Sequence, residues 1–200
     1  MTAGPIISGE FPAVGVVAGH SVTLHYGNIA GEYSSLLEGA MITDRSVRGR
    51  TRFDGPKAAE MLTGLVTNDV LSLLPGHGQY AAALSPKGRI IADVRVFAHT
   101  DHLLVDVPPR ARAGWDALVR KYVNPRVVPY VDIATQMRQL VIAGVAARSI
   151  LGPAAGIARE ALAGLASYAQ LDAQIGGQPV MTARSPDLAA EGFALSLAAE

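Results

Sequence analysis

The sequence predicts an α+β fold, with helices packed on one face of mostly antiparallel sheets. Two segments keep apolar residues at helical spacing, and three short apolar runs joined by turn-like connections lie between them. Short turns between strands favour antiparallel pairing. The first half of the chain therefore has the predicted order β-α-β-β-β-α-β, which is typical of the α+β class.

The first predicted elements are a lead-in, a helix and an extended segment. Residues 5–19 are rich in Gly, Pro and small apolar residues, which predicts an irregular lead-in. Gly39 stands where a helix would end, and residues 41–54 read as extended because apolar or small residues alternate there. The stripe that predicts the helix before Gly39 consists of Ile29, Tyr33, Leu36 and Leu37.

A second helix and three strands follow. Pro56 can open the helix, and strands are predicted at residues 79–85, 89–98 and 102–107. The apolar face of this helix consists of Ala58, Met61, Leu62 and Leu65. Another helix starts at Pro109, and residues 126–133 close the unit as a strand. The apolar face of that last helix consists of Trp115, Leu118, Val119 and Tyr122.

The second half of the chain weakly echoes the first. It begins with a strand that ends at Gly144, and helical segments broken near Gly152 and Pro153 follow. Further strands are predicted near 178–184 and 192–197. A break near Thr135 suggests a boundary, which gives the domain prediction: 1–23 lead-in, 24–134 βαβββαβ subdomain, and 135–200 second α+β subdomain, expected to be incomplete.

Composition narrows the class of protein. Half of the residues are apolar and 17% are charged, which is typical of a globular chain. Acidic and basic residues balance at 17 each, which argues against a nucleic-acid-binding protein. The alternating arginines at positions 45, 48, 50 and 52 are predicted to be the solvated face of a strand. Without cysteine, a disulfide scaffold and a thiolate site are excluded. With no signal peptide or membrane span, a cytoplasmic location is expected.

Polar side chains interrupt the apolar strands at Tyr80, Asp93, Arg95 and Asp106. A buried polar group without a partner costs about 1–3 kcal/mol, so these residues indicate either a satisfied core network or a pocket for a polar ligand. Asp93 and Arg95 share a strand face. They form either a salt bridge or a site in which the guanidinium keeps the carboxylate charged for a ligand's ring N–H groups.

Other candidates are weaker. The five histidines lack metal-ligand spacing, and no GxSxG sequence marks a nucleophile, so neither a metal site nor a serine triad is predicted. Asn68 and Asp69 are read either as a turn pair or as functional residues. Lys87 and Arg89 are read either as a solvated hairpin tip or as cations that attract a polyanion at a pocket mouth.

Four segments resemble the folate-binding superfamily of the glycine-cleavage T-protein (aminomethyltransferase), and in particular its YgfZ-like branch, which is linked to iron–sulfur cluster maintenance. The resemblance covers residues 24–144 well and the remainder loosely. It implies tetrahydrofolate in a central cavity and a T-protein/YgfZ-like fold without the C-terminal β-rich domain. The segments are LHYGNIAGEYSSLLEGAMITDRS (24–46), VTNDV (66–70), GQYAAAL (78–84) and KGRIIADVRVF (87–97).

The resemblance also implies site residues. Tyr80 and Leu84 would pack on the folate, and Asp106 would lie near its one-carbon end. KGRIIADVRVF is similar to the strand on which T-proteins carry two adjacent aspartates. The first of these, which is thought to act on the reactive folate nitrogen, falls at Ala92, and only the second is kept, as Asp93. No residue is therefore predicted to be catalytic, because alanine supplies no carboxylate and Asp93 points to the opposite strand face.

The chain also departs from the family near its end. YgfZ-like proteins carry a KGCxxGQE segment beyond this region, which is absent here, and the position of a pterin-binding glutamate falls at Ala190, one place before Glu191. We therefore expect the first part of a family member, either a fragment or a short form.

The expected function is tetrahydrofolate binding in support of iron–sulfur cluster assembly or repair, or of tRNA modification. Iron–sulfur client proteins are possible partners, and no direct nucleic-acid or membrane partner is expected. The alternative is a tetrahydrofolate-dependent aminomethyltransferase or demethylase that uses Asp93 or Asp106. A third possibility is an interaction module that binds no ligand.

Overall fold

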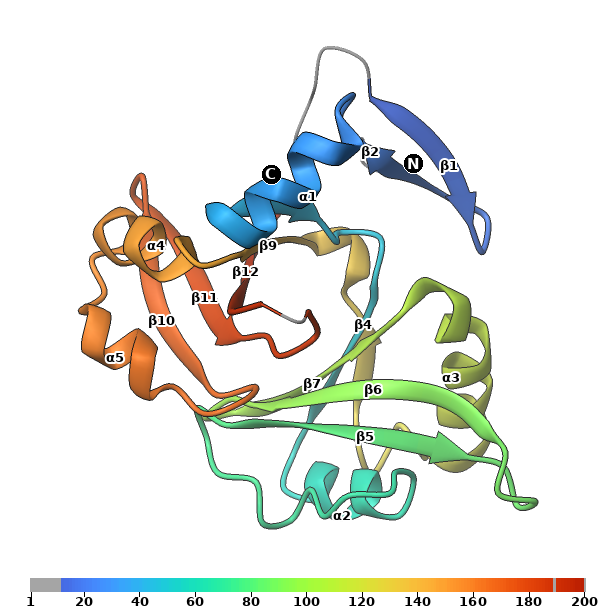
Figure 1. Cartoon of the computed structure of the whole chain (residues 1–200). Coiled ribbons are helices and arrows are strands. Elements are labelled where there is room, and N and C mark those ends of the chain that lie inside the picture. Colours follow the sequence, from blue (N-terminus) through green and yellow to red (C-terminus); the bar gives the residue numbers. More distant parts are fainter. Residues whose placement is uncertain (1–11, 189, 200) are drawn as a thin grey trace. The chain divides into compact units, whose positions relative to one another are not determined.

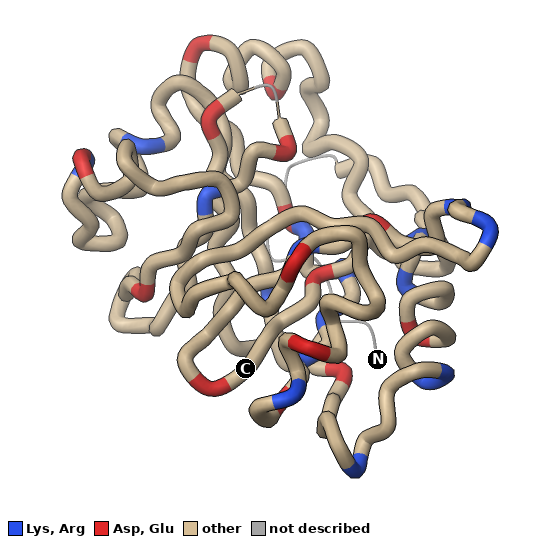
Figure 2. Tube along the Cα trace, turned by 90° about the horizontal axis from the view of Figure 1, so that it is seen from below, with Lys and Arg blue, Asp and Glu red and all other residues tan. Residues whose placement is uncertain are grey.

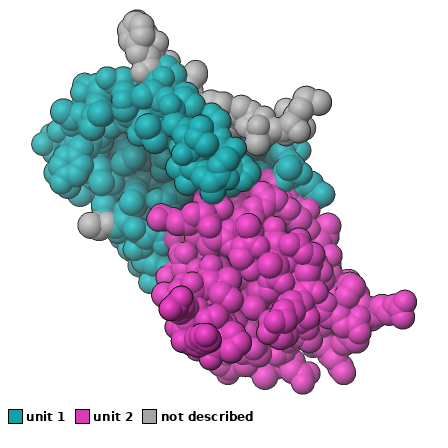
Figure 3. Space-filling model, turned by 90° about the vertical axis from the view of Figure 1, so that its right-hand side faces the viewer, with its two compact units in different colours: residues 1–47, 135–200 teal, residues 48–134 magenta. Residues whose placement is uncertain are grey.

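The computed structural model describes residues 12–188 and 190–199, and the chain divides into two compact units (Figures 1 and 3). Unit 2 is the continuous stretch Arg48–Ala134, whereas unit 1 combines Met1–Val47 with Thr135–Glu200. Every pairing between the named strands is antiparallel. The α+β class is thereby confirmed, while the domain division into 1–23, 24–134 and 135–200 stays a prediction.

Unit 2 is a five-stranded sheet, in the order β5-β6-β7-β4-β8, with helices on one face. Alternate residues of the strands point to that face, and they form one apolar core with the inner sides of the helices. The strands are β4 (Gly49–Asp54), β5 (Gly78–Leu84), β6 (Ile90–Ala98), β7 (His102–Val107) and β8 (Tyr130–Asp132). The helices are α2 (Ala58–Thr63) and α3 (Pro109–Tyr122).

Trp115 anchors α3 to the middle of this sheet. Its side chain is 1% exposed, and its ring meets Phe53 of β4 edge-on, with centroids 6.2 Å apart. The indole Nε1 donates a hydrogen bond to Thr51 Oγ1 at 3.2 Å, so the one polar atom of the ring is satisfied. Pro109 occupies the first turn of α3, where its missing N–H costs nothing.

The β5–β6 hairpin contains a register shift near its turn. Ala83 pairs with Ala92 but Leu84 pairs with Ile90, so Ile91 is the extra residue. Gly114 of α3 lies against this point, and a Cβ on Gly114 would lie 2.9 Å from Ile91 Cγ2. Glycine at this position therefore lets the helix approach the strand closely.

Unit 1 contains a second five-stranded sheet, in the order β10-β11-β12-β9-β3, and a separate hairpin of β1 and β2. Its larger apolar core lies between the sheet and the helices α4 and α5, around Leu151, Leu162 and Phe193. The sheet strands are β3 (Met41–Asp44), β9 (Met137–Ala143), β10 (Gln170–Ile175), β11 (Gln178–Arg184) and β12 (Gly192–Ala198). The other elements are β1 (Ala13–Val17), β2 (His20–His25), α1 (Ile29–Glu38), the 3₁₀ turn Ala134–Gln136 at the unit boundary, α4 (Ala147–Ala155) and α5 (Arg159–Gly164).

The prediction of an irregular lead-in is wrong for the part of this segment that the structure describes. Residues 13–25 form a hairpin, and residues 1–11 lie outside the described residues. Ala18 and Gly19 both have positive φ, of 51° and 81°. This conformation closes a two-residue turn between Val17 and His20 with the twist that a hairpin requires.

Three further predictions of elements need correction. The extended segment 41–54 is two strands in different sheets, because β3 pairs with β9 whereas β4 pairs with β7 and β8. The strand predicted at 126–133 is only Tyr130–Asp132. Pro153 lies inside α4, and the helix ends instead at Gly156, which adopts a left-handed conformation.

A charged triad joins α4 to the last two strands of unit 1. Glu191 precedes β12, and its Oε1 accepts hydrogen bonds from Arg148 of α4 and Arg184 of β11. Arg184 also lies over the ring of Phe193, 5.3 Å from its centroid. Burial by itself would raise the pKa of Glu191, but the hydrogen bonds from the two arginines outweigh it and lower the pKa below the usual glutamate range.

Gly144→Ala is expected to destabilise unit 1 by at least about 2 kcal/mol, because its positive φ disfavours a side chain and no space exists for one. Gly144 has φ 131°, and a Cβ there would lie 2.4 Å from the carbonyl oxygen of Gly39. Urea unfolding monitored by circular dichroism measures the change. Gly164→Ala is the matched control, because a Cβ at Gly164 meets no atom within 4 Å. Equal stability of the two variants would contradict the close approach.

Glu191→Gln is expected to destabilise the protein by about 1–3 kcal/mol at neutral pH, because it removes the charge from both hydrogen bonds. Because the pKa of Glu191 is lower in the folded protein, the unfolded chain binds a proton at Glu191 at a higher pH than the folded protein does. The contribution of Glu191 is therefore complete above the ordinary glutamate pKa and is lost as the pH falls through the lower folded-state value.

Stability measured between pH 7 and pH 3 should consequently fall less steeply in Glu191→Gln than in the wild type. Glu160→Gln, at an exposed position in the first turn of α5, is the control and should keep the wild-type slope. An unchanged slope in Glu191→Gln would remove the triad as a source of acid sensitivity.

Candidate functional site

A row of polar side chains crosses the sheet of unit 2 on the face opposite α2 and α3. The strand registers place Tyr80 opposite Arg95, Arg95 opposite Asp106, and Asp106 opposite Arg50. Neighbouring residues such as Val94, Val96 and Val105 point to the other face and are fully buried in the core. Three of the residues predicted from the sequence, Tyr80, Arg95 and Asp106, therefore lie in one line across β5, β6 and β7.

Asp106 is the centre of a buried ion cluster in this row. Its Oδ1 accepts from Arg48 Nε at 2.5 Å and from Arg95 Nη1 at 3.4 Å, and its Oδ2 lies 3.7 Å from Arg50 Nε. The side chains of Asp106 and Arg50 are 3% and 1% exposed. Three guanidinium groups therefore surround one carboxylate, and these four side chains together carry an excess of positive charge.

The prediction that the alternating arginines form a solvated strand face is wrong for Arg48 and Arg50, which are 8% and 1% exposed. β4 has a neighbouring strand on each side, so its residues are not at an edge. Arg52 of β4 is more exposed and contacts Asp54 and Asp101. The remaining member of the series, at position 45 in unit 1, contacts Asp187.

Arg48 keeps one donor without an acceptor. Its Nη2 is buried, and no hydrogen-bond partner for it lies among the residues that the structure describes. A buried unsatisfied donor of a charged group is costly, and such groups in native structures call for an explanation. An acceptor oxygen supplied by a ligand would satisfy it.

Asp93 and Leu84 lie apart from the row. Asp93 is opposite Ala82 on β5. It lies two residues before Arg95 and therefore on the same face of the sheet. The salt bridge considered for Asp93 and Arg95 is not present, because Arg95 contacts Asp106 instead and Asp93 makes no ion pair within the described part of the chain. Leu84 follows the register shift and borders a cavity near the turn.

Ala92 lies in the apolar core of unit 2. It is 1% exposed and pairs with Ala83, whereas Asp93 pairs with Ala82. Positions 92 and 93 therefore point to opposite faces, as their strand parity predicts. A carboxylate at position 92 would be surrounded by apolar side chains in this conformation.

Asn68 and Asp69 have a structural role, which supports their reading as a turn pair. Asn68 Nδ2 donates to the carbonyl oxygen of Tyr80 at 3.2 Å, and Asp69 Oδ1 accepts from the backbone N–H of Leu71 at 2.9 Å. The second contact is a side-chain-to-backbone bond of the Asx-turn kind. Together these contacts fix the loop against the start of β5 and so help to place Tyr80.

Within residues 12–188 and 190–199, no group of three or more histidine or acidic side chains is arranged to hold a metal ion. His99 and His102 flank the β6–β7 turn with their rings stacked, centroids 4.3 Å apart. No helix in these ranges is sufficiently long and apolar to cross a membrane.

Curated relatives of this chain include aminomethyltransferases. That of Synechococcus sp. (strain RCC307) is 28% identical over 183 residues, which cover 91% of this chain and 50% of the relative. That of Rubrobacter xylanophilus is 28% identical over 180 residues, covering 90% of this chain and 48% of the relative. The chain thus spans about half the length of the curated relatives it matches.

Solved structures show a similar fold. Aminomethyltransferase T of the glycine cleavage system from Bartonella henselae superposes with a TM-score of 0.79 at 21% identity, covering 93% of this chain and 50% of that one. A chain of the heterotetrameric sarcosine oxidase from Corynebacterium sp. U-96 gives a TM-score of 0.58 at 14% identity, covering 84% of this chain and 82% of that one. The family profile described as the GCVT N-terminal domain matches residues 12–200. This protein belongs to the GCVT N-terminal domain family of the glycine-cleavage T-protein superfamily.

Proposed function

We propose that the polar face of unit 2 binds tetrahydrofolate and that the protein is a folate-binding member of the YgfZ type. Family membership supports a folate ligand. The observation that carries the proposal is the ion cluster around Asp106, where Arg48 keeps a buried donor with no acceptor among the described residues. A ligand with both acceptor and donor groups fits this face, because Asp93 on the same face makes no ion pair within the described residues.

Each predicted residue has a role that follows from its chemistry. The Asp93 carboxylate accepts hydrogen bonds from ring N–H groups of a pterin. The Tyr80 side chain is 48% exposed and offers an aromatic surface to the folate. Arg48 Nη2 donates to an oxygen of the ligand, and charge-assisted bonds of this kind are stronger than neutral ones.

Asp106 acts indirectly in this proposal. Its two carboxylate oxygens face Arg48, just before β4, Arg50 of β4 and Arg95 of β6. Asp106 is therefore better suited to position these cations than to bind the folate itself. Arg95, opposite both Tyr80 and Asp106, links the cluster to the exposed aromatic ring. Leu84, near the turn, would contact the end of the ligand that extends past Asp93.

The geometry at position 92 supports binding without aminomethyl transfer. When bound, tetrahydrofolate supplies the nitrogen that accepts the one-carbon unit, and transfer needs a carboxylate within hydrogen-bond reach of it. Position 92 carries alanine and points into the core, and in this proposal the Asp93 carboxylate is used by the ring N–H groups, so neither position supplies that carboxylate. A role in iron–sulfur cluster assembly or repair, or in tRNA modification, with iron–sulfur client proteins in the cytoplasm, is the YgfZ-type function that we infer.

A second candidate is aminomethyl transfer itself, which the names of the curated relatives favour. In that case Asp93 would replace the missing aspartate as the group close to the folate nitrogen. The two candidates share the ligand and differ only in turnover.

Isothermal titration with tetrahydrofolate tests the binding site. We expect the wild type to bind, and Asp93→Asn to bind at least about tenfold more weakly because a charge-assisted hydrogen bond is lost. Asp172→Asn, at an exposed position in β10 of unit 1, is the matched control and should bind like the wild type. No binding at millimolar tetrahydrofolate, or equal binding by Asp93→Asn, would refute the proposed site.

A one-carbon transfer assay separates the two candidates. The protein is incubated with tetrahydrofolate and an aminomethyl donor, whose transferred carbon is already at the oxidation level of formaldehyde, so that transfer gives methylene-tetrahydrofolate and ammonia without an oxidant. Methylene-tetrahydrofolate is quantified by mass spectrometry. The YgfZ-type proposal predicts no turnover in a protein that binds tetrahydrofolate. Turnover that disappears in Asp93→Asn would establish the transferase instead.

A further inference from the structure

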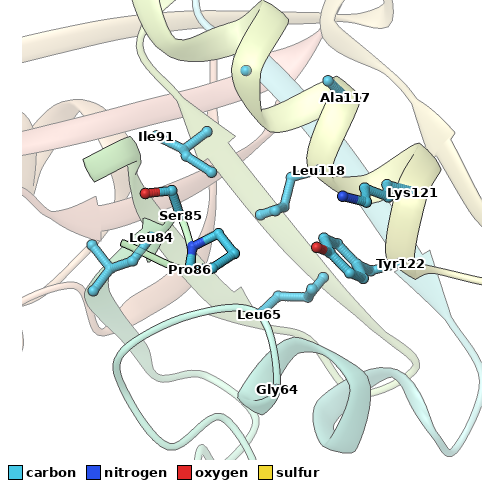
Figure 4. Close-up of a pocket in the computed structure, with 11 residues that line it drawn as sticks. Gly64, Leu65, Leu84, Ser85, Pro86, Ile91, Ala117, Leu118, Lys121 and Tyr122 are labelled. Carbon is cyan, nitrogen blue, oxygen red and sulfur yellow. The ribbon is translucent and has the colours of Figure 1, made fainter. Parts of the chain in front are cut away.

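A second site lies on the helix side of unit 2, away from the polar row. A cavity of about 520 Å³ opens between α3 and the turn end of the β5–β6 hairpin, with the end of α2 as its third wall (Figure 4). Its size is within the range of small-molecule pockets. No residue of the ion cluster around Asp106 lines it, and of the residues assigned to the folate only Leu84, next to the register shift, borders it.

The walls of the cavity are apolar. Leu65 follows α2, Ile91 is the extra residue of the β5–β6 register shift, and Leu118 comes from α3. Gly64 and Gly114 also line the cavity and add no side chain to fill it. The close packing of Gly114 on Ile91 therefore fixes one wall rigidly.

Polar groups gather at one side of the mouth. Lys121 Nζ lies 5.0 Å from the centroid of the Tyr122 ring, a cation–π contact, and Tyr122 is 46% exposed. In Figure 4 the nitrogen of Lys121 and the hydroxyl of Tyr122 both point toward the cavity. Lys121 makes no ion pair with any residue in the described ranges. Both groups can therefore donate hydrogen bonds to one anionic group.

The charge around the mouth is positive. Ser85 and Pro86 line the cavity and lead directly into the turn that carries Lys87 and Arg89, which are exposed. This turn is the segment furthest to the right in Figures 1 and 2, and Figure 2 shows it with Lys and Arg colours. The nearest acidic residue on α3, Asp116, contacts Arg112 at 4.0 Å.

We propose that this cavity binds an apolar carboxylic acid, of the class of medium-chain fatty acids. The alkyl chain would lie among Leu65, Ile91 and Leu118, and burial of each CH₂ group contributes about 0.8 kcal/mol. The carboxylate would accept hydrogen bonds from Lys121 Nζ and the Tyr122 hydroxyl. An acid, unlike a neutral apolar ligand, would also accept a charge-assisted hydrogen bond from the ammonium group of Lys121, so the pair Lys121–Tyr122 favours an acid.

Calorimetric titration of the full chain with decanoate, below its micelle concentration, tests the proposal. Ala117→Trp should block the cavity and abolish binding, because Ala117 lines it from an exposed helix position where a larger side chain does not disturb the core. Ala113→Trp, on the same exposed side of α3 but outside the cavity lining, should bind like the wild type. Circular dichroism checks that both variants fold.

The charge is tested separately. Lys121→Gln should weaken decanoate binding by roughly tenfold and leave decanol binding unchanged, whereas Arg120→Gln should affect neither. No binding by the wild type at millimolar decanoate, or undiminished binding by Ala117→Trp, would overturn the site. Equal affinity of Lys121→Gln and the wild type for decanoate would overturn the ligand class. Tetrahydrofolate binding should persist in Ala117→Trp, so failure here is distinguishable from failure at the folate face.

Discussion

The arrangement of unit 2 depends on the ion pairs between the carboxylate of Asp106 and three arginines. The carboxylate contacts Arg48, which directly precedes β4, Arg50 of β4 and Arg95 of β6, and the side chains of Asp106 and Arg50 are almost fully buried. Removing one partner of a buried ion pair leaves an uncompensated charge, which typically costs about 3–5 kcal/mol. A slip of one residue in the register of β4 would move Arg50 into the apolar core and Thr51 away from Trp115. The cluster therefore helps to fix the pairing of β4, β6 and β7.

The same sheet has two chemically different faces because side chains alternate along each strand. On one face, Val94, Val96 and Val105 pack against the helices. On the other, the row from Tyr80 to Arg50 carries the charges. Because of this alternation, Ala92 lies among apolar side chains whereas its neighbour Asp93 lies on the charged face. Residues 92 and 93, adjacent in one strand, thus face an apolar core and a polar surface.

Local features were well predicted from the sequence. The strand His102–Val107 and the helix that begins at Pro109 have the expected bounds, because hydrophobic spacing and turn residues determine them within a few positions. The row of Tyr80, Arg95 and Asp106 was partly foreseen, since polar residues on apolar strands need partners. The depth of Arg50 was missed, because its burial depends on β7 and β8, which pair with β4 from distant parts of the sequence. The sequence did contain an indication of this burial, because Asp106 places a negative charge in an otherwise apolar strand and so requires a buried positive partner such as Arg50. Leu84 was taken as part of the same wall as Tyr80, but the register shift between them cannot be read from alternation alone.

The order of the two units along the chain has a consequence for how the protein assembles. Unit 2 is continuous, and its first and last strands are neighbours, with Thr51 opposite Asp132. In unit 1, by contrast, Met41 pairs with Ala143, roughly a hundred residues later in the chain. Contacts between distant residues form slowly because a long loop must close first. During synthesis, unit 2 can complete its sheet while β3 still lacks its partner β9. Rapid folding of the inserted unit shortens that loop, because it brings the chain segments before Arg48 and after Ala134 to adjacent strands.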